Sequence, residues 1–276
     1  MIAKITNENT IEVYDLSQFD INSIMNSGQV FRWDFTHCDN CYTLDSGDKE
    51  ANLYYEKSKA IISTKHTEYF FNYFDLNNDY NLIKSELTKY NTINKILNDE
   101  PSVGGIRILK GDFIETVISF IISANNNIKR FSNTIFLLCN KFGTNNAFPT
   151  LQQLQTITQD EFKKIGCGYR DSYLVNTVKM LSGSDFIFEV LNQLDNKDLE
   201  KKLMTLSGVG KKVANCIMLF CFNRLYIAPV DTWIKKAIDK MPDADKQVLL
   251  NHKYAGVAQQ YIFYYLQHLK RELSEN

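Results

Sequence analysis

The stretch that decides the fold is Leu203-Met204-Thr205-Leu206-Ser207-Gly208-Val209-Gly210-Lys211-Lys212-Val213-Ala214-Asn215-Cys216. Apolar residues recur at helical spacing on both sides of Gly208-Val209-Gly210, a segment too short to form an element of its own. Two glycines around one apolar residue permit positive φ and leave backbone N–H groups uncovered. The stretch therefore predicts a helix-hairpin-helix over about residues 197–222, with its second helix beginning at about Lys211.

The start of this second helix carries two lysines. A helix N-terminus is partially positive and favours acidic side chains, so Lys211 and Lys212 oppose the local preference. Such departures often mark functional sites. A lysine held there in its uncharged form would be a nucleophile able to form a Schiff base. Two solvated lysines, or two contacts to phosphate, explain the same residues equally well.

A carboxylate follows one helix and one return loop later. Asp231 comes after Ala228-Pro229-Val230 and before an amphipathic stretch, so we expect it to cap the N-terminus of the next helix. Capping explains the residue by itself. If the chain returns to the same site, this carboxylate could instead stabilise a sugar cation and steer proton transfer.

Together these residues resemble a known signature. Lys212 within Gly-Val-Gly-Lys-Lys-Val-Ala and Asp231 within Pro-Val-Asp are similar to the helix-hairpin-helix base-excision glycosylases, and most of all to the 8-oxoguanine DNA glycosylases. In that family the matching lysine attacks the sugar C1′ and the matching aspartate assists. The resemblance implies catalytic roles for Lys212 and Asp231, and DNA contacts through the backbone from Gly208 through Val209 and Gly210 to Lys211.

Length and composition set the broad class. The chain has 276 residues, of which 44% are hydrophobic and 13% aromatic, enough for one large or two modest folded domains. It contains no run of about 18 apolar residues and no signal-peptide core at its first residues. We therefore expect an intracellular protein that does not span a membrane.

The cysteines do not form a metal-binding pattern. Six are present, and Cys38 and Cys41 form one CxxC without a second pair at zinc spacing. The four-cysteine pattern of the iron–sulfur glycosylases is absent. We expect reduced, mostly buried thiols, no metal centre and no organic cofactor, although the hairpin carbonyls could hold a structural cation.

Charge is unevenly distributed, although the formal net charge is only −1. Residues 1–83 carry six basic and thirteen acidic side chains, whereas the remaining residues carry twenty-five and nineteen. A basic C-terminal region fits phosphate binding, but the same asymmetry occurs in proteins without nucleic-acid partners.

The spacing of apolar residues along the chain predicts an α+β fold. We expect an antiparallel β domain with short helices over residues 1–104 and a helical domain over 105–276. The expected strands are 11–14, 30–35, 52–55 and 60–63. The expected helices besides the hairpin are 15–25, 112–124, 158–165 (opened by a Thr158–Glu161 capping box) and 252–273.

One N-terminal motif bears on the lesion. Ser27-Gly28-Gln29-Val30-Phe31-Arg32-Trp33 fits a helix end followed by a strand, and it also resembles the N-terminal segment of 8-oxoguanine glycosylases. In the family, the carbonyl of the glycine matched by Gly28 accepts a hydrogen bond from N7–H of the oxidised base. Guanine has a bare acceptor at N7, so one backbone oxygen can separate lesion from normal base.

Two further segments resemble the family's contacts to the opposite strand. The run Asn125-Asn126-Asn127-Ile128-Lys129-Arg130 reads by itself as a polar turn between helices, and Gly168-Tyr169-Arg170 as a helix end with a loop. The resemblance implies that Asn125 and Arg130 contact the unpaired cytosine. It also implies that Tyr169 fills the vacated stack and that Arg170 is a second reader.

The closing helix would complete the base pocket. Gln259 and Phe263 lie on one face of it, where an aromatic residue is usually part of the core. In the family the matching glutamine reads the base's Watson–Crick edge and the matching phenylalanine stacks on one face, while Cys216 would cover the other. Trp233 departs from the pattern, because relatives often have a histidine there near the phosphate, but its indole N–H could supply one donor for the same DNA contact.

The resemblance as a whole implies a bifunctional enzyme. We expect it to act as a monomer on duplex DNA containing 8-oxoguanine opposite cytosine, by base flipping, lysine attack, an imine intermediate and β-elimination. Two alternatives remain at this level. A monofunctional glycosylase for another base would keep Asp231 without needing Lys212 or Gly28, and a non-catalytic hairpin module would only bind DNA.

Overall fold

The computed structural model describes residues 2–36 and 40–275, except the side chains of Trp233 and of residues 268–275. The chain forms two compact units. The first comprises Met1–Leu44, Glu50–Lys110 and Asn223–Asn276, and the second comprises Asp45–Lys49 and Gly111–Phe222. The sequence predicts two consecutive domains instead, with a boundary near residue 104, so the grouping of the C-terminal segment with the N-terminal one is a difference.

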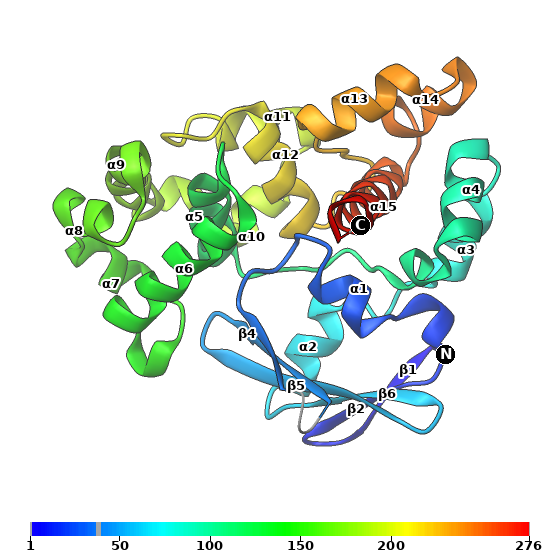
Figure 1. The fold of residues 1–276 in the computed structure, drawn as a ribbon. Helices are drawn as coiled ribbons and strands as arrows, with labels where there is room; N and C mark the ends of the chain where they lie inside the picture. The colour runs from blue at the N-terminus through cyan, green and yellow to red at the C-terminus, as the bar shows by residue number, and fades with distance from the viewer. Residues whose placement is uncertain (1, 37–39, 276) are drawn as a thin grey trace. The chain divides into compact units, whose positions relative to one another are not determined.

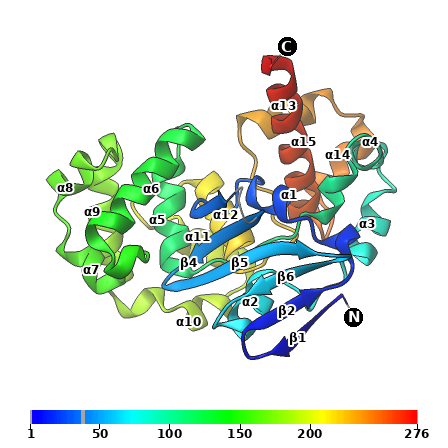
Figure 2. The same cartoon turned by 60° about the horizontal axis from the view of Figure 1, so that its bottom comes forward.

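The first unit contains a six-stranded sheet in the order β1-β2-β6-β5-β4-β3 (Figure 2). Its strands are β1 (Ala3–Asn7), β2 (Thr10–Val13), β3 (Trp33–Thr36), β4 (Cys41–Ser46), β5 (Lys49–Glu56) and β6 (Lys59–Ser63). The expected strands at 11–14, 52–55 and 60–63 are confirmed, and the β1–β2, β2–β6, β5–β6 and β3–β4 pairs are antiparallel. The N-terminal antiparallel sheet followed by helices confirms the α+β class.

Alternation along the strands builds the core of this unit. Ile11 and Val13 of β2 and Leu53 of β5 are fully buried. They belong to one apolar cluster with Phe70 and Phe74, which come from helix α2 (Thr67–Tyr73) and its C-terminal end. In Figure 1 the cyan helix α2 lies against the sheet. The period of two in the sequence therefore places one face of the sheet against a helix.

The helix expected over 15–25 is interrupted. It forms a 3-10 turn, η1 (Leu16–Gln18), and a separate helix, α1 (Ile21–Met25). Phe19 is extended between them, and Asp20 caps α1 by accepting a hydrogen bond from the Ser23 amide over 2.7 Å. Local capping by aspartates thus divides a segment whose apolar pattern is continuous.

The other helices of the first unit come from both ends of the chain. They are α3 (Tyr80–Leu87), α4 (Asn91–Asp99), η2 (Pro101–Gly105), α13 (Thr232–Lys240), α14 (Asp243–Leu250) and α15 (Ala255–Glu275). Helix α15 packs against α4, α13, α14 and η2. Buried Asp245 of α14 also accepts hydrogen bonds from the amide and hydroxyl of Thr92, at 2.7 and 2.6 Å. These contacts join the C-terminal helices to the N-terminal unit.

The second unit is helical. Its helices are α5 (Phe113–Ser123), α6 (Ile128–Phe142), η3 (Thr144–Asn146), α7 (Leu151–Thr156), α8 (Gln159–Lys164), η4 (Gly168–Arg170), α9 (Asp171–Leu181), η5 (Ser184–Phe186), α10 (Phe188–Asn192), α11 (Asn196–Leu203) and α12 (Lys211–Phe220). Helix α5 is mostly buried and packs against α6, α9 and α12. The capping box of Thr158 and Glu161 at the start of α8 is confirmed. Among the described residues, no helix combines the length and the apolar character needed to cross a bilayer.

Candidate active site

The predicted hairpin is present in the second unit between α11 and α12 (Figure 1). Gly208 has φ +81°, and a Cβ on it would lie 2.9 Å from Tyr173 Cβ, so both conformation and space require glycine. Thr177 of α9 donates to the Ser207 carbonyl over 2.7 Å. Val209 is buried below the turn. Helix α9, which carries both Tyr173 and Thr177, therefore fixes the hairpin loop.

The start of α12 is open on its outer side. A Cβ on Gly210 would meet no atom within 4 Å, and no side chain caps the helix there. Lys211 is exposed, whereas Lys212 is partly buried with Nζ 5.8 Å from the centroid of the Phe120 ring. The two lysines thus differ in setting, since only Lys212 has its amine against an aromatic face of α5. That contact has no signal in the sequence, because Phe120 is one of many apolar residues in α5.

The inner face of α12 carries Cys216, which is buried one turn beyond Lys212. Asn215 has a buried Oδ1 atom without a hydrogen-bond partner. The described cysteines are uncrosslinked. Among the described residues, no three His, Cys, Asp or Glu side chains gather as a metal ion would need, and Cys38 of the CxxC lies outside that part of the chain.

The predicted opposite-strand residues come together in the second unit. Asn125 has φ +51° in the turn between α5 and α6, and it is exposed. A Cβ on Gly168 would lie 3.9 Å from a terminal nitrogen of Arg130, which is also exposed. Tyr169 is exposed and lies edge-on to Tyr173, with ring centroids 6.1 Å apart. Residues from two distant segments therefore share one surface.

Arg170 is buried, in contrast to its exposed neighbours. Its Nε donates to the Ala124 carbonyl over 2.8 Å, and its terminal nitrogens donate to the carbonyls of Ala124, Asn125 and Cys167. In this arrangement the guanidinium fixes the turn that carries Asn125. Its role as a second reader of cytosine stays a prediction. Burial raises the pKa of the adjacent Cys167 thiol to about 12, so that thiol is protonated and packs as an apolar group.

Two predicted lesion readers meet in the first unit. Gly28 has φ +78°, and a Cβ on it would lie 3.1 Å from Cε1 of Phe263 in α15. Gln260 donates a short hydrogen bond to the Ser27 carbonyl, and the Ser23 hydroxyl donates to Tyr264 over 3.3 Å. The glycine loop is therefore held on the face of α15 that carries Phe263.

Gln259 lies one turn before Phe263 and is buried, with an Oε1 atom that has no hydrogen-bond partner. Burying an unpaired amide oxygen is costly, and such atoms often await a ligand. Asp231 caps α13 as expected, because its Oδ1 accepts from the Ile234 amide over 2.8 Å. The side chain of Trp233 lies outside the described residues, so its predicted phosphate contact stays a prediction.

Each unit thus gathers its own set of predicted residues. The second holds the hairpin with Lys212 and Cys216, and the residues predicted to face the opposite strand. The first holds Gly28, Gln259 and Phe263, and the capping carboxylate of Asp231. The role of Gln29 was not anticipated: its carboxamide donates to the Arg107 carbonyl over 2.9 Å and accepts from the Leu109 amide over 3.0 Å.

Comparison with known proteins defines the class. Residues 13–117 match the family model for the 8-oxoguanine DNA glycosylase N-terminal domain. Residues 118–248 match the model for HhH-GPD superfamily base excision DNA repair proteins. The fold and the hairpin are therefore those of a base-excision repair protein.

Individual relatives show which kind of base-excision repair protein the chain resembles. The chain is 28% identical over 260 residues to an N-glycosylase/DNA lyase of Saccharomyces cerevisiae, covering 80% of this chain and 67% of that protein. It is 30% identical to N-glycosylase/DNA lyase OGG1 of Arabidopsis thaliana, covering 58% of this chain and 48% of the relative. The 8-oxoguanine glycosylase/lyase of Clostridium acetobutylicum, solved with DNA containing cytosine opposite 8-oxoguanine, is 30% identical with a TM-score of 0.88 and covers 98% and 100% of the two chains. The chain belongs to the 8-oxoguanine glycosylase/lyase family of N-glycosylases with DNA lyase activity.

Proposed function

We propose that the chain excises 8-oxoguanine from duplex DNA as a bifunctional glycosylase and AP lyase, preferentially opposite cytosine. The observation that carries the proposal is the contact between Gly28 and Phe263, which are far apart in sequence and match the family's lesion readers. The unpartnered amide oxygen of Gln259 lies on the same helix. A carbonyl-bearing glycine, an aromatic face and a free amide acceptor are the groups that would recognise one oxidised purine.

The chemistry would begin at Lys212. The lone pair of its Nζ attacks C1′ of the flipped nucleotide, the C1′–N9 bond breaks, and the purine leaves with the electron pair and takes up a proton. The attached amine loses a proton, the C1′–O4′ bond breaks and O4′ takes up a proton, which gives a protonated imine between Nζ and C1′. Removal of a C2′ proton then expels the 3′ phosphate by β-elimination. Asp231 would stabilise the positive charge that develops on the sugar.

Recognition of the opposite base would use the second unit. Arginine donates hydrogen bonds only, so Arg130 suits the O2 and N3 acceptors of cytosine. Exposed Tyr169 would enter the space left by the flipped base, where stacking offsets part of the cost of extrusion. The cytosine in the Clostridium acetobutylicum complex supports the same opposite base. Backbone N–H groups of Gly208, Gly210 and Lys211 would bind phosphate oxygens at the open start of α12. The Val209 amide, which was expected to contribute, already donates to the Leu206 carbonyl over 3.1 Å.

A trapping and cleavage panel tests this function. Wild type, Lys212→Gln and Lys211→Gln are incubated with 8-oxoguanine opposite each of the four bases, with and without borohydride. We expect wild type to cleave fastest opposite cytosine and to give a covalent complex. Lys212→Gln should give neither product, and Lys211→Gln should still be trapped at saturating DNA.

Three other outcomes would overturn parts of the proposal. Base release without trapping indicates a monofunctional glycosylase. DNA binding with neither reaction indicates a non-catalytic hairpin module. Equal turnover opposite all four bases contradicts the preference for cytosine.

A further inference from the structure

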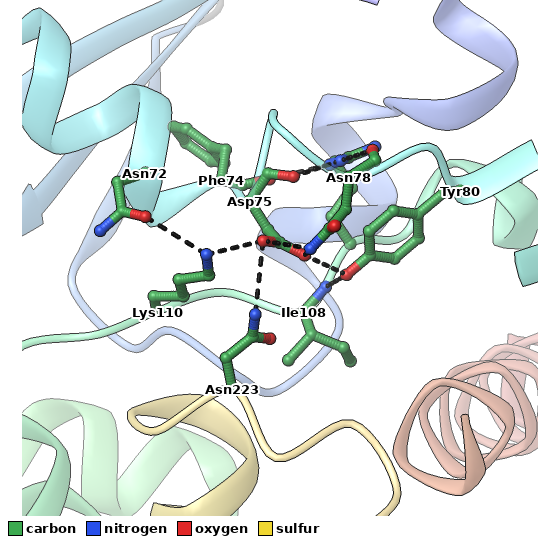
Figure 3. Close-up of polar contacts among 9 residues, drawn as sticks. Asn72, Phe74, Asp75, Asn78, Tyr80, Ile108, Lys110 and Asn223 are labelled. Carbon is green, nitrogen blue, oxygen red and sulfur yellow. Dashed lines mark hydrogen bonds and ion pairs between the residues drawn. The ribbon is translucent and has the colours of Figure 1, made fainter. Parts of the chain in front are cut away.

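Two of the chain segments that connect the compact units contact the same carboxylate, that of Asp75. The first unit is left after Lys110 and re-entered at Asn223. Lys110 Nζ lies 2.7 Å from Asp75 Oδ1, and Asn223 Nδ2 donates to the same oxygen over 3.4 Å (Figure 3). Residues that stand at two separate connections are therefore joined through Asp75.

Asp75 is built into the interior of the first unit. Its side chain is fully buried, and its φ of +53° is uncommon for a residue other than glycine. Oδ2 accepts from the Tyr80 hydroxyl over 3.1 Å, and both oxygens accept from Asn78 Nδ2 over 2.9 Å. A buried carboxylate persists only when it is paired and hydrogen-bonded, and Lys110 supplies the opposite charge. The surroundings thus hold Asp75 in a strained backbone conformation.

The segment that leads to the first connection is fixed along its length. The Ile108 amide donates to the Tyr80 hydroxyl over 3.0 Å, and the Lys110 amide donates to the Tyr73 carbonyl over 2.8 Å. The Arg107 guanidinium lies 4.0 Å from the Tyr80 ring centroid. It donates to the carbonyls of Gln18, Phe74, Asp75 and Asn78. Movement of this segment would break several buried hydrogen bonds at once.

The same two connections are also tied together in the second unit. The Gly111 amide donates to the Phe220 carbonyl over 2.8 Å. A Cβ on Gly111 would lie 2.7 Å from Thr116 Oγ1, so the approach depends on glycine. In each unit, therefore, polar contacts join the two connections within a few residues of the points where the chain passes between the units.

We propose that Asp75 is a positioning residue that anchors the connections at Lys110 and Asn223 to the first unit and so restricts motion about them. Its influence reaches Gly28, because Gln29 is hydrogen-bonded to Arg107 and Leu109 in the anchored segment. Asn223 begins the loop that leads to Asp231. The catalytic consequence rests on the proposed function: Asp75 keeps a lesion reader and the assisting carboxylate in place.

Amide hydrogen exchange of the DNA-free protein tests the anchor without any assay of activity. The variants are Asp75→Asn, Lys110→Met and Asn223→Ala. The matched control is Asp245→Asn, since Asp245 is also buried in the first unit and accepts two hydrogen bonds, but from Thr92 and not from a connection. Asp75→Asn should accelerate exchange in both 107–111 and 222–226 by about tenfold or more, as loss of hydrogen bonds to a charged group predicts.

The control and the milder variants keep the test decisive. Asp245→Asn should accelerate exchange around Thr92 alone. If Asp75→Asn does not fold, amide exchange in Lys110→Met and Asn223→Ala tests the anchor instead. Loosening one connection should loosen the other, because both contact the same carboxylate. Unchanged protection at 222–226 in Asp75→Asn or Lys110→Met would overturn the anchor, as would equal loosening by the control.

Excision of 8-oxoguanine separates failure of the anchor from failure of the proposed function. We expect Asp75→Asn to lower kcat by about tenfold or more with little change in KM, because the hairpin is intact while reacting groups are less well placed. Asp245→Asn should match wild type. A wild type without excision would defeat the proposed function and leave the exchange result standing. An active wild type with unchanged exchange and kcat in Asp75→Asn would defeat the anchor alone.

Discussion

Arg107 in the first unit and Arg170 in the second have the same local arrangement in different settings. Both are buried, at 0% and 4% exposed, and both guanidinium groups donate to backbone carbonyls. Each lies against a tyrosine ring, at 4.0 Å for Tyr80 and 4.4 Å for Tyr169. The rings differ, because Tyr80 is 0% and Tyr169 57% exposed. A buried arginine that donates to carbonyls and lies against a tyrosine ring therefore fixes a core segment in one unit and a surface turn in the other.

This difference separates support from recognition. Three of the carbonyls held by Arg107 belong to the buried residues Gln18, Phe74 and Asp75. Two of those held by Arg170 belong to Ala124 and Asn125, in the turn before the helix that carries the exposed Arg130. An arginine whose guanidinium already donates to backbone carbonyls has few N–H groups left for a ligand. We infer that Arg170 acts mainly by holding Asn125 at φ +51°, while Arg130 keeps its donors for a partner.

Replacing Arg107 should have the largest effect on stability. Arg107→Met leaves four carbonyls and the neighbouring Asp75 without the guanidinium, and we expect a loss of about 3–5 kcal/mol in the free energy of unfolding. Urea denaturation measures it as a lower midpoint at unchanged slope. A smaller loss than that of Arg170→Met would contradict the difference drawn between the two arginines.

Arg170→Met should cost less, about 1–2 kcal/mol, because water can reach the exposed turn and replace some of the lost bonds. The released turn should also weaken the preference for cytosine over adenine opposite the lesion. Denaturation and single-turnover excision on the two duplexes measure the two effects. Reduced preference with full stability would favour Arg170 as a direct reader.

The buried tyrosine should make the first unit sensitive to alkali. Burial, with the Asp75 charge adding to it, raises the pKa of Tyr80 well above its ordinary value. Above pH 10 the unfolded chain loses this proton while the folded chain keeps it, so stability falls by about 1.4 kcal/mol per pH unit for this group. Tyr80→Phe should therefore lose stability less steeply above pH 10 than wild type. Parallel curves in denaturation from pH 9 to 11 would contradict the assignment.

Arg130→Ala should have the smallest effect on stability, within about 0.5 kcal/mol, because the side chain is exposed. Under the proposed function it should still lower the rate opposite cytosine more than the rate opposite adenine. Excision rates on the two duplexes, with denaturation as the control, measure this. Equal slowing on both would indicate a general DNA contact and remove Arg130 from base recognition.

Features with local causes could be predicted from the sequence. Gly208 and Gly210 define the hairpin, its second helix begins at Lys211 as expected, and Thr158 with Glu161 forms the capping box of α8. The strand expected over 30–35 begins only at Trp33, after a segment in which the Gln29 side chain is hydrogen-bonded to Arg107 and Leu109.

Features that depend on distant partners could not be predicted. Nothing local marks Asp75 or Arg107 as buried, since charged residues are normally solvated and their partners lie far along the chain. The contact of Lys212 with Phe120 and the packing of α15 onto N-terminal elements are of the same kind. Gly28 and Phe263 were paired only through the family resemblance, because neither periodicity nor spacing connects them.

The most direct test of the central claim identifies the amine that reacts. Wild-type protein is reduced with borohydride during incubation with 8-oxoguanine opposite cytosine, and the adduct is digested and mapped by mass spectrometry. The account predicts that the sugar remnant is on Lys212, which is partly buried against Phe120. An adduct on Lys211 or on any other amine, or base release without an adduct, would contradict it.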